Sequence, residues 1–242
     1  MRLNKYLSDI GVCSRRQADK MIEEGRVTVD GRKAKLGQQV EGDEEICVDH
    51  NKVRVNQKKV ILLVNKPVGI VCTTEKREKN NIVDFLKYPI RIYPIGRLDK
   101  DSNGLILMTN DGEIVNKIMR AGNYHEKEYL VKVNRPITKE FLDGMANGVP
   151  ILDTVTRKCS IWQVSKQTFR IVLTQGLNRQ IRRMCEFFDY EVVSLKRERI
   201  MNLKLGDLKE GTYREITQEE KEELYRRIEN SSSDTVKWNE EG

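Results

Sequence analysis

Hydrophobic positions at the start of the chain follow one helical pattern, then a second, and then a strand pattern. The first helical face has the i, i+3, i+4, i+7 spacing and consists of Leu3, Tyr6, Leu7 and Ile10. Ser14 and Gln17 have the spacing of a capping box, which predicts a second helix ending at Gly25. Residues 27–29 alternate as a strand does, and Asp30 with Gly31 predicts a hairpin turn.

A compact first unit over residues 1–50 follows from this pattern and from the segment after it. Residues 36–50 contain five acidic residues and no Lys or Arg, and a short strand is expected at 46–48. Residues 51–59 are polar and are interpreted as a linker to a second unit.

The second unit, residues 60–230, alternates apolar strand patterns with short helical patterns. Strands are expected at 60–65, 91–95, 104–109, 127–133, 149–152, 158–164, 169–174 and 191–200. Helices are expected at 81–87, 111–121, 138–146, 179–188 and 217–229. This order lacks a regular βαβ repeat, so we expect an α+β fold around a mixed, largely antiparallel sheet. Residues 231–242 are interpreted as a loose tail.

The charge of the chain points to a polyanionic partner. The 242 residues carry a formal net charge of +7. Residues 217–242 contain 8 acidic and 4 basic side chains, so the rest of the chain carries +11. Nucleic acid is the commonest partner of so basic a surface, although a well-solvated surface is the alternative.

Several classes of protein are disfavoured by composition. No apolar stretch approaches the ~18–20 residues of a membrane span, and the N-terminus lacks the apolar core of a secretory signal. We therefore expect a soluble cytoplasmic protein with no membrane partner. The five cysteines include no CxxC pair and there are only two histidines, which disfavours a disulfide framework, a metal site and a Ser-His-Asp triad.

Basic side chains of the first unit suggest a phosphate-binding surface. The candidates are Arg2, Lys5, Arg15, Arg16, Arg32 and Lys33. Two of them begin the capped helix, where free N–H groups and the helix dipole also attract phosphate. A charged solvent face is the alternative. The segment nevertheless resembles the alpha-L RNA-binding motif of S4-like domains almost continuously, and this resemblance implies a module that grips structured RNA.

A polar loop between two apolar strands is the strongest candidate for chemistry. It lies within residues 94–110 and carries Asp99 and Asp101. Three interpretations are open from the residues alone. The loop could be a turn with Asp99 paired to an arginine, a cation-binding loop without the EF-hand pattern, or part of a glycosidase-like carboxylate pair.

The whole string 94–110 resembles the signature of pseudouridine synthases, in the branch that modifies ribosomal RNA and carries an N-terminal alpha-L module. Segments 63–69, 127–131 and 176–184 resemble further motifs of that family in the expected order. The resemblance covers roughly residues 1–217.

The resemblance implies that Asp99 is the catalytic carboxylate, acting as a nucleophile or as a base. It also implies that Tyr129 stacks on the base and helps to remove the C5 proton, and that Arg182 keeps Asp99 ionised. A half-buried strand tyrosine and a surface phosphate contact are the plain alternatives for these two residues. Phosphate contact is favoured for Arg179 and Arg183. The substrate-binding set implied is Gly96, Arg97, Leu98, Lys127, Arg179, Gln180, Ile181 and Arg183.

The resemblance implies an enzyme that flips a uridine of large-subunit ribosomal RNA out of its stack and isomerises it to pseudouridine. Arg97 is expected to fill the vacated space or hold a flanking phosphate. A tRNA stem-loop is a further candidate substrate. No cofactor is expected, and a monomer is assumed. The alternatives are a non-catalytic RNA-binding or ribosome-assembly protein and a glycoside-type hydrolase that uses Asp99.

Overall fold

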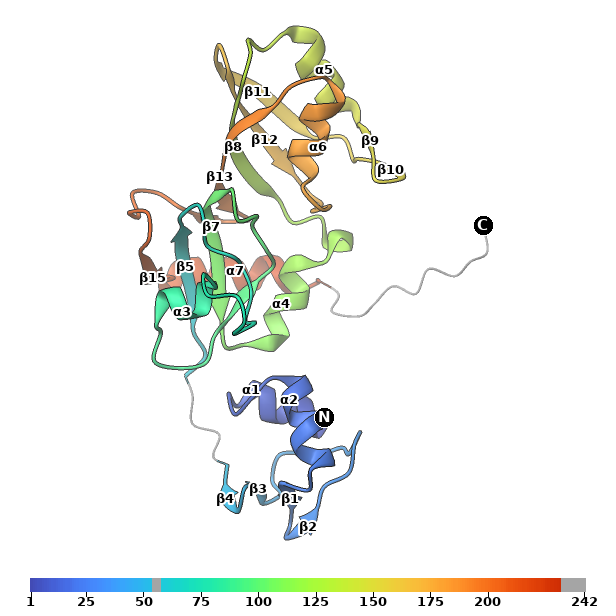
Figure 1. Ribbon diagram of the computed structural model, residues 1–242, viewed down its shortest axis with the longest axis vertical. Coiled ribbons are helices and arrows are strands. Elements are labelled where there is room, and N and C mark those ends of the chain that lie inside the picture. The colour runs from blue at the N-terminus through green and yellow to red at the C-terminus, as the bar shows by residue number, and fades with distance from the viewer. Residues whose placement is uncertain (54–57, 232–242) are drawn as a thin grey trace. The chain divides into compact units, whose positions relative to one another are not determined.

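The computed structural model describes residues 1–53 and 58–231 (Figure 1). The chain divides into two compact units, which are described separately. The first comprises Met1–Val60 with the short segments Tyr88–Ile92 and Asn110–Gly112, and the second comprises the remainder. Residues 54–57 of the expected linker and 232–242 of the expected tail lie outside the described residues.

The first unit contains the two helices and the hairpin that the sequence predicts. Its elements are α1 (Leu3–Asp9), α2 (Arg15–Glu23), β1 (Val27–Val29), β2 (Arg32–Lys33), β3 (Ile46–Val48) and β4 (Asn51–Lys52). The four strands form an antiparallel sheet in the order β2-β1-β3-β4. Ser14 caps α2, and its capping box with Gln17 is formed in both directions. Strand β4 differs from the sequence interpretation, because it continues the sheet into the segment expected to be a linker.

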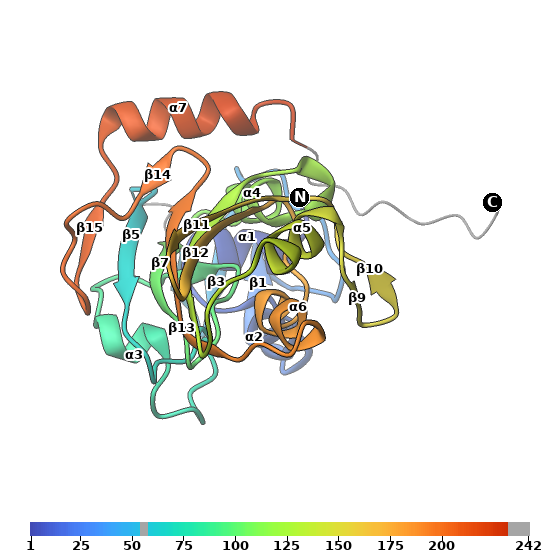
Figure 2. The same ribbon diagram turned by 90° about the horizontal axis from the view of Figure 1, so that it is seen from above.

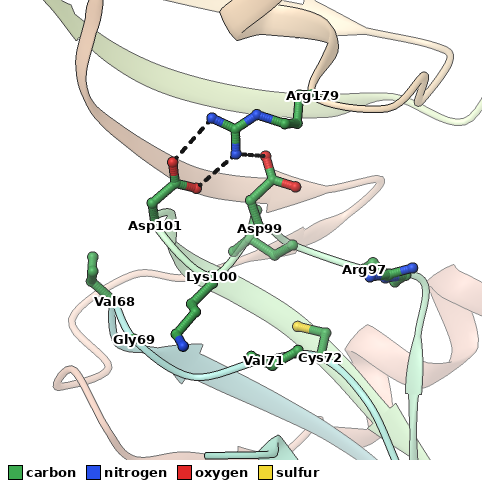
Figure 3. A pocket seen from close by; sticks show the side chains of 10 residues that line it. Val68, Gly69, Val71, Cys72, Arg97, Asp99, Lys100, Asp101 and Arg179 are labelled. Carbon is green, nitrogen blue, oxygen red and sulfur yellow. Dashed lines mark hydrogen bonds and ion pairs between the residues drawn. The ribbon is translucent and has the colours of Figure 1, made fainter. Parts of the chain in front are cut away.

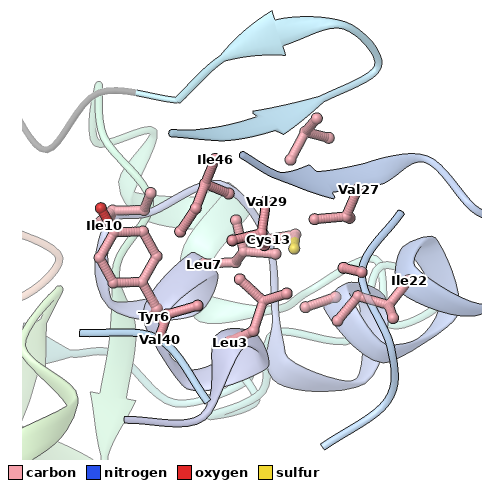
Figure 4. Packing of buried hydrophobic residues seen from close by; sticks show 13 residues of the cluster. Leu3, Tyr6, Leu7, Ile10, Cys13, Ile22, Val27, Val29, Val40 and Ile46 are labelled. Atoms are coloured by element: carbon pink, nitrogen blue, oxygen red, sulfur yellow. The ribbon is translucent and has the colours of Figure 1, made fainter. Parts of the chain in front are cut away.

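One hydrophobic cluster holds this small unit together (Figure 4). Leu3 and Leu7 of α1 and Ile22 of α2 pack against Val27 of β1 and Ile46 of β3. All five side chains are at most 4% exposed. The helical face identified in the sequence is therefore the face that the unit buries.

The second unit is built on a nine-stranded sheet (Figures 1 and 2). Its strands are β5 (Ile61–Lys66), β6 (Tyr93–Ile95), β7 (Asn103–Thr109), β8 (Lys127–Val133), β11 (Ser160–Ser165), β12 (Thr168–Leu173), β13 (Val192–Ile200), β14 (Leu203–Lys204) and β15 (Tyr213–Glu215). The main path is β11-β12-β8-β13-β7-β5-β15, while β14 pairs with β13 and β6 with β7. The β13–β7 pair is parallel and the other pairs are antiparallel. The expected α+β class with a mixed, largely antiparallel sheet is confirmed.

Helices and a two-stranded hairpin complete the second unit. They are α3 (Ile82–Leu86), α4 (Gly112–Met119), η1 (Ala121–Asn123), α5 (Lys139–Asn147), β9 (Pro150–Ile151), β10 (Thr154–Val155), α6 (Gln180–Phe187) and α7 (Gln218–Ile228). The predicted elements are all present, with ends that differ by no more than two residues. Elements β10, β14, β15 and η1 were not predicted from the sequence, since two or three residues are too few to show a period.

Helices α4 and α7 bury their apolar faces against β5, β7 and β13. Ile114 and Ile118 of α4 and Leu224 of α7 join a cluster with Leu63 and Leu107 of the sheet. At the other end of the sheet, near β11 and β12 in Figure 1, Phe141 of α5 meets Phe169 of β12 edge to face, with ring centroids 5.5 Å apart. In the part of the chain that the structure describes, no helix combines the length and apolarity needed to cross a membrane.

The parallel contact between β7 and β13 depends on a glycine. Gly104 is the register partner of Arg197, and its φ of +101° is unfavourable for other residues. A Cβ at this position would overlap the main-chain oxygen of Arg197 and lie 2.8 Å from its nitrogen. The absence of a side chain at Gly104 therefore lets β7 and β13 approach closely. This pair joins β11, β12 and β8 on one side of the sheet to β5 and β15 on the other.

We expect Gly104→Ala to destabilise the protein by about 3 kcal/mol, because it adds both overlap and backbone strain. Urea unfolding would measure the change. Gly122→Ala is the matched control, since a Cβ at Gly122 meets nothing within 4 Å. The control should stay within about 0.5 kcal/mol of the parent. Equal stability of the two variants would refute the role assigned to Gly104.

Candidate active site

The loop with the two aspartates connects β6 to β7. These strands pair antiparallel, so the loop of residues 96–102 closes a hairpin at the edge of a rigid sheet. Gly96 enters the loop with a φ of +76°, and a Cβ there would overlap the side chain of Met119. Asp99 and Ser102 close a turn through the hydrogen bond from Ser102 N to Asp99 O at 3.1 Å.

The main chain of this loop is held from several directions. Gly69 N donates to Lys100 O at 2.7 Å. Arg182 of α6 donates from Nη2 to Asp101 O at 3.1 Å, and Arg197 of β13 donates from Nη1 to Arg97 O at 3.3 Å. Arg197 Nε also donates to Leu105 O at 2.7 Å. The arginine side chains therefore fix the loop that presents Asp99.

Arg179 faces both carboxylates of the loop (Figure 3). Its Nη1 lies 3.9 Å from Asp99 Oδ2, and its two terminal nitrogens donate to Asp101 at 3.3 and 3.2 Å. The side chain of Asp99 is 36% exposed. Burial raises the pKa of Asp101, but the hydrogen bond from Arg179 and the charge of Arg182 outweigh it and hold that pKa below its usual value.

The cation beside Asp99 differs from the one expected. Arg182 was expected to pair with Asp99, yet among the described residues it pairs with Asp101, with Nη2 3.4 Å from Oδ2, and donates to Ser102 Oγ at 3.2 Å. Arg179, expected at the helix surface, supplies the ion pair to Asp99 instead. The reason is local. Arg179 precedes α6 in a left-handed conformation that turns it toward the loop, whereas Arg182 lies on the buried face of the helix.

A cavity of about 420 Å³ lies against the loop, within the size range of small-molecule sites. Asp99, Tyr129 and Ile181 line it together with Arg197. Tyr129 is 8% exposed on β8, and its ring centroid is 6.0 Å from Cζ of Arg197. A carboxylate, an aromatic ring and an apolar wall thus line the same cavity.

A second hollow of about 570 Å³ lies against the same loop, where Figure 3 shows it. Its walls include Val68, Val71 and Cys72 from the segment after β5. Asp99 lines both hollows, whereas Tyr129 lines only the smaller one. The smaller cavity is therefore the better candidate for an aromatic base.

The structure brings together most of the site residues expected from the sequence. Those lining the smaller cavity are Gly96, Arg97, Leu98, Asp99, Lys127, Tyr129, Arg179, Gln180, Ile181 and Arg182. Arg183 is not among them, because it bonds back to Asn178 through Nε to O at 3.1 Å and Nη2 to Oδ1 at 3.2 Å.

The basic residues expected to bind RNA in the first unit lie on its surface. Lys5 is half-buried, and the exposed side chains are Arg2, Arg15, Arg16, Arg32 and Lys33. Arg15 and Arg16 occupy the first turn of α2, as the capping box predicts.

Among the charged residues that line the cavity, Arg197 is the one that was not predicted from the sequence. It is 3% exposed and lies two positions after Leu195 on β13, which also lines the cavity. In a strand, residues i and i+2 share a face. A charged residue on the buried face of a predicted strand was the signal that could have found it.

Lys127 is a buried cation at the base of the cavity. It is 5% exposed, and its Nζ donates to His125 O at 3.3 Å. Burial, followed by the charge of Arg197, lowers the pKa of Lys127 to about 8. In the described ranges, no group of three His, Cys, Asp or Glu side chains could hold a metal ion.

Comparison with known proteins agrees with the class that this fold and site define, an S4-type module followed by a base-modifying catalytic domain. The family model for RNA pseudouridylate synthase matches residues 60–187, and the S4 domain model matches residues 1–46. The chain belongs to the RNA pseudouridylate synthase family.

Curated relatives and a solved structure are similar over nearly the whole chain. The dual-specificity RNA pseudouridine synthase RluF of Escherichia coli is 54% identical over 97% of this chain and 81% of its own. Ribosomal large subunit pseudouridine synthase B of Bacillus subtilis is 40% identical over 92% of this chain and 95% of its own. A crystal structure of a pseudouridylate synthase covers 93% of this chain and 99% of its own, with a TM-score of 0.68 and 28% identity. In sequence, segments 120–123, 125–129 and 229–233 resemble ribosomal large subunit pseudouridine synthase F in particular. The 54% identity to RluF agrees with that resemblance.

The depressed pKa of Lys127 predicts a rise of stability at alkaline pH. Below pH 8 the lysine is charged in both states, and the folded state bears the full penalty of burying it. Between about pH 8 and about pH 10.5 the unfolded chain binds more protons, so the free energy of unfolding rises with pH. The total gain is roughly 3 kcal/mol.

Urea unfolding at several pH values, compared between the parent and Lys127→Met, measures this contribution. The parent should gain stability relative to the variant across that window. A constant difference between the two proteins from pH 7 to 10 would contradict the assigned pKa.

Proposed function

We propose that this protein isomerises a uridine of large-subunit ribosomal RNA to pseudouridine, with a tRNA stem-loop as a further substrate. The observation that carries the proposal is the Asp99 carboxylate on the wall of the cavity that also contains Tyr129, with Arg179 3.9 Å away. The reaction takes place in the cytoplasm, and the protein acts as a monomer.

The chemistry requires one carboxylate and no cofactor. The N1–C1′ bond of the uridine breaks, the uracil turns and a C5–C1′ bond forms, after which the C5 proton is lost to water and N1 takes up a proton. Atoms are conserved apart from this proton exchange, and nothing is oxidised. Asp99 acts at the sugar or base, with the guanidinium of Arg179 3.9 Å from its carboxylate.

Tyr129 stacks on the detached base and assists loss of the C5 proton. Its ring borders the cavity from β8, while Ile181 and Leu98 supply apolar walls. The cavity of about 420 Å³ has room for one base, which must leave its stack to enter, at a cost of roughly a few kcal/mol. Arg97 is exposed at the mouth of the cavity and fills the vacated position or holds a flanking phosphate.

The first unit holds the RNA. Arg15 and Arg16 add positive charge to the N-terminal turn of α2, where main-chain N–H groups also face outward. The names of the two relatives support the choice of substrate, since one acts on the large ribosomal subunit and the other has two specificities.

We expect Asp99→Asn to abolish pseudouridine formation while RNA affinity changes less than about threefold, because the amide keeps the shape of the side chain and loses its charge. The assay follows tritium released to water from ribosomal RNA labelled at C5 of uracil. Asp143→Asn, on the exposed surface of α5, is the matched control and should behave as the parent. Tritium release by Asp99→Asn at the parent rate would remove Asp99 from the catalytic role. Binding by the parent without any release would favour a non-catalytic RNA-binding protein.

The double variant Arg15→Gln, Arg16→Gln should weaken RNA binding and make it less sensitive to salt. Removal of each phosphate-binding arginine reduces the slope of log K against log salt concentration by about 0.7 to 0.9. Filter binding at several KCl concentrations would measure the slope. Arg226→Gln on α7, an arginine paired with Glu223, is the control and should leave the slope unchanged. An unchanged slope in the double variant would mean that these arginines do not contact phosphate.

A further inference from the structure

The charges around the smaller cavity do not cancel. The charged side chains that line it are Arg97, Asp99, Lys127, Arg179, Arg182 and Arg197. Arg179 has carboxylate partners in Asp99 and Asp101, and Arg182 has one in Asp101. Arg97 is exposed to water, which screens its charge. Lys127 and Arg197 are the two that remain.

Lys127 and Arg197 are buried, and neither pairs with a carboxylate among the described residues. Lys127 is 5% exposed and donates to His125 O at 3.3 Å. Arg197 is 3% exposed and donates to Leu105 O and Arg97 O. Its third nitrogen, Nη2, has no hydrogen-bond partner within the described part of the chain. The lining of the cavity therefore has an excess of buried positive charge.

These two cations flank the residue that would stack on the base. Lys127 and Tyr129 lie two positions apart on β8, so their side chains share one face of the sheet. Arg197 is the register partner of Tyr129 on β13, with Cζ 6.0 Å from the centre of the ring. A base stacked on Tyr129 would lie beside both charges.

Burying a cation without a counter-ion opposes folding, so such groups are uncommon in structures unless they interact with something else. Arg197 has a structural task, since it holds the loop of Asp99 through main-chain oxygens. Lys127 has no comparable task, because its hydrogen bond goes to His125 O, two residues away in the chain, and joins no separate segments. Its charge is therefore best explained by what the cavity receives.

We propose that Lys127 and Arg197 make this cavity an anion site for the detached pyrimidine base. When the N1–C1′ bond breaks, its electron pair remains on the uracil, and the negative charge spreads over N1 and the two carbonyl oxygens. Asp99 balances the positive charge left at C1′. The two buried cations stabilise the uracil anion until C5 bonds to C1′ and the C5 proton leaves. This inference rests on the proposed function.

Lys127→Met tests the inference, because it removes the charge and keeps a chain of similar length. We expect kcat for tritium release to fall about a hundredfold and RNA affinity to stay within about threefold, since the anion exists only after binding. Thermal stability should rise at the same time, which loss of a merely structural lysine would not produce. Lys132→Met, an exposed lysine of the same strand, should match the parent in rate.

A better leaving group should reduce the need for the cations. Fluorine withdraws electrons, so 5-fluorouracil is a stronger acid than uracil and leaves more readily as an anion. RNA with 5-fluorouridine at the target position is therefore compared with uridine RNA in single turnovers, by following loss of the original N-linked nucleoside after nuclease digestion. The rate deficit of Lys127→Met should be about tenfold smaller on the fluorinated RNA. Equal deficits on the two RNAs, or no deficit on uridine RNA, would overturn the inference.

Variants of the second cation keep the test decisive if Lys127→Met folds poorly. Arg197→Gln should show the same dependence on the leaving group, and Arg197→Lys should recover part of the rate because it restores the charge without both main-chain hydrogen bonds. Arg199→Met is the control, since Arg199 pairs with Glu126 and Glu128 and does not line the cavity. A parent protein that releases no tritium would refute the proposed function itself. If the parent releases tritium and the uncharged variants Lys127→Met and Arg197→Gln release it at the same rate, only the anion site would be refuted.

Discussion

The catalytic domain depends on the hydrogen bonds that arginine side chains donate to the main chain of one loop. Arg182 reaches Asp101 O from α6, and Arg197 reaches Arg97 O from β13. A loop between two strands has few internal hydrogen bonds of its own, so its shape comes from these outside donors. The same arginines border the cavity. Arg182 and Arg197 therefore both position the loop that carries Asp99 and place positive charge beside the cavity.

Much of the fold was predictable because its elements have clear periods. The two helices of the first unit repeat apolar residues at helical spacing, and strands such as β8 alternate over their whole length. Strands β14 and β15 were missed because they contain too few residues to show alternation. Their pairing is decided by the longer strands beside them. This information is tertiary and cannot be read from a local window.

The members of the site were easier to predict than their partners. Motif resemblance named Asp99, Tyr129 and Arg182 as neighbours, and all three line one cavity. It did not reveal that Arg179 is the cation beside Asp99, since this depends on a left-handed residue just before α6. Nor did it indicate Arg197, whose burial depends on pairing with β8 and β7. The motifs were enough to predict which residues line the site. Which arginine pairs with which aspartate depends on the three-dimensional structure.

The long sequence distance between the loop and its arginines has a consequence for biosynthesis. Arg182 holds a residue 81 positions earlier, and Arg197 one 100 positions earlier. The buried hydrophobic cluster of the first unit lies within residues 3–48, so all of its members are synthesised before either arginine. A nascent chain thus completes the core of the first unit well before α6 and β13 are available to hold the Asp99 loop.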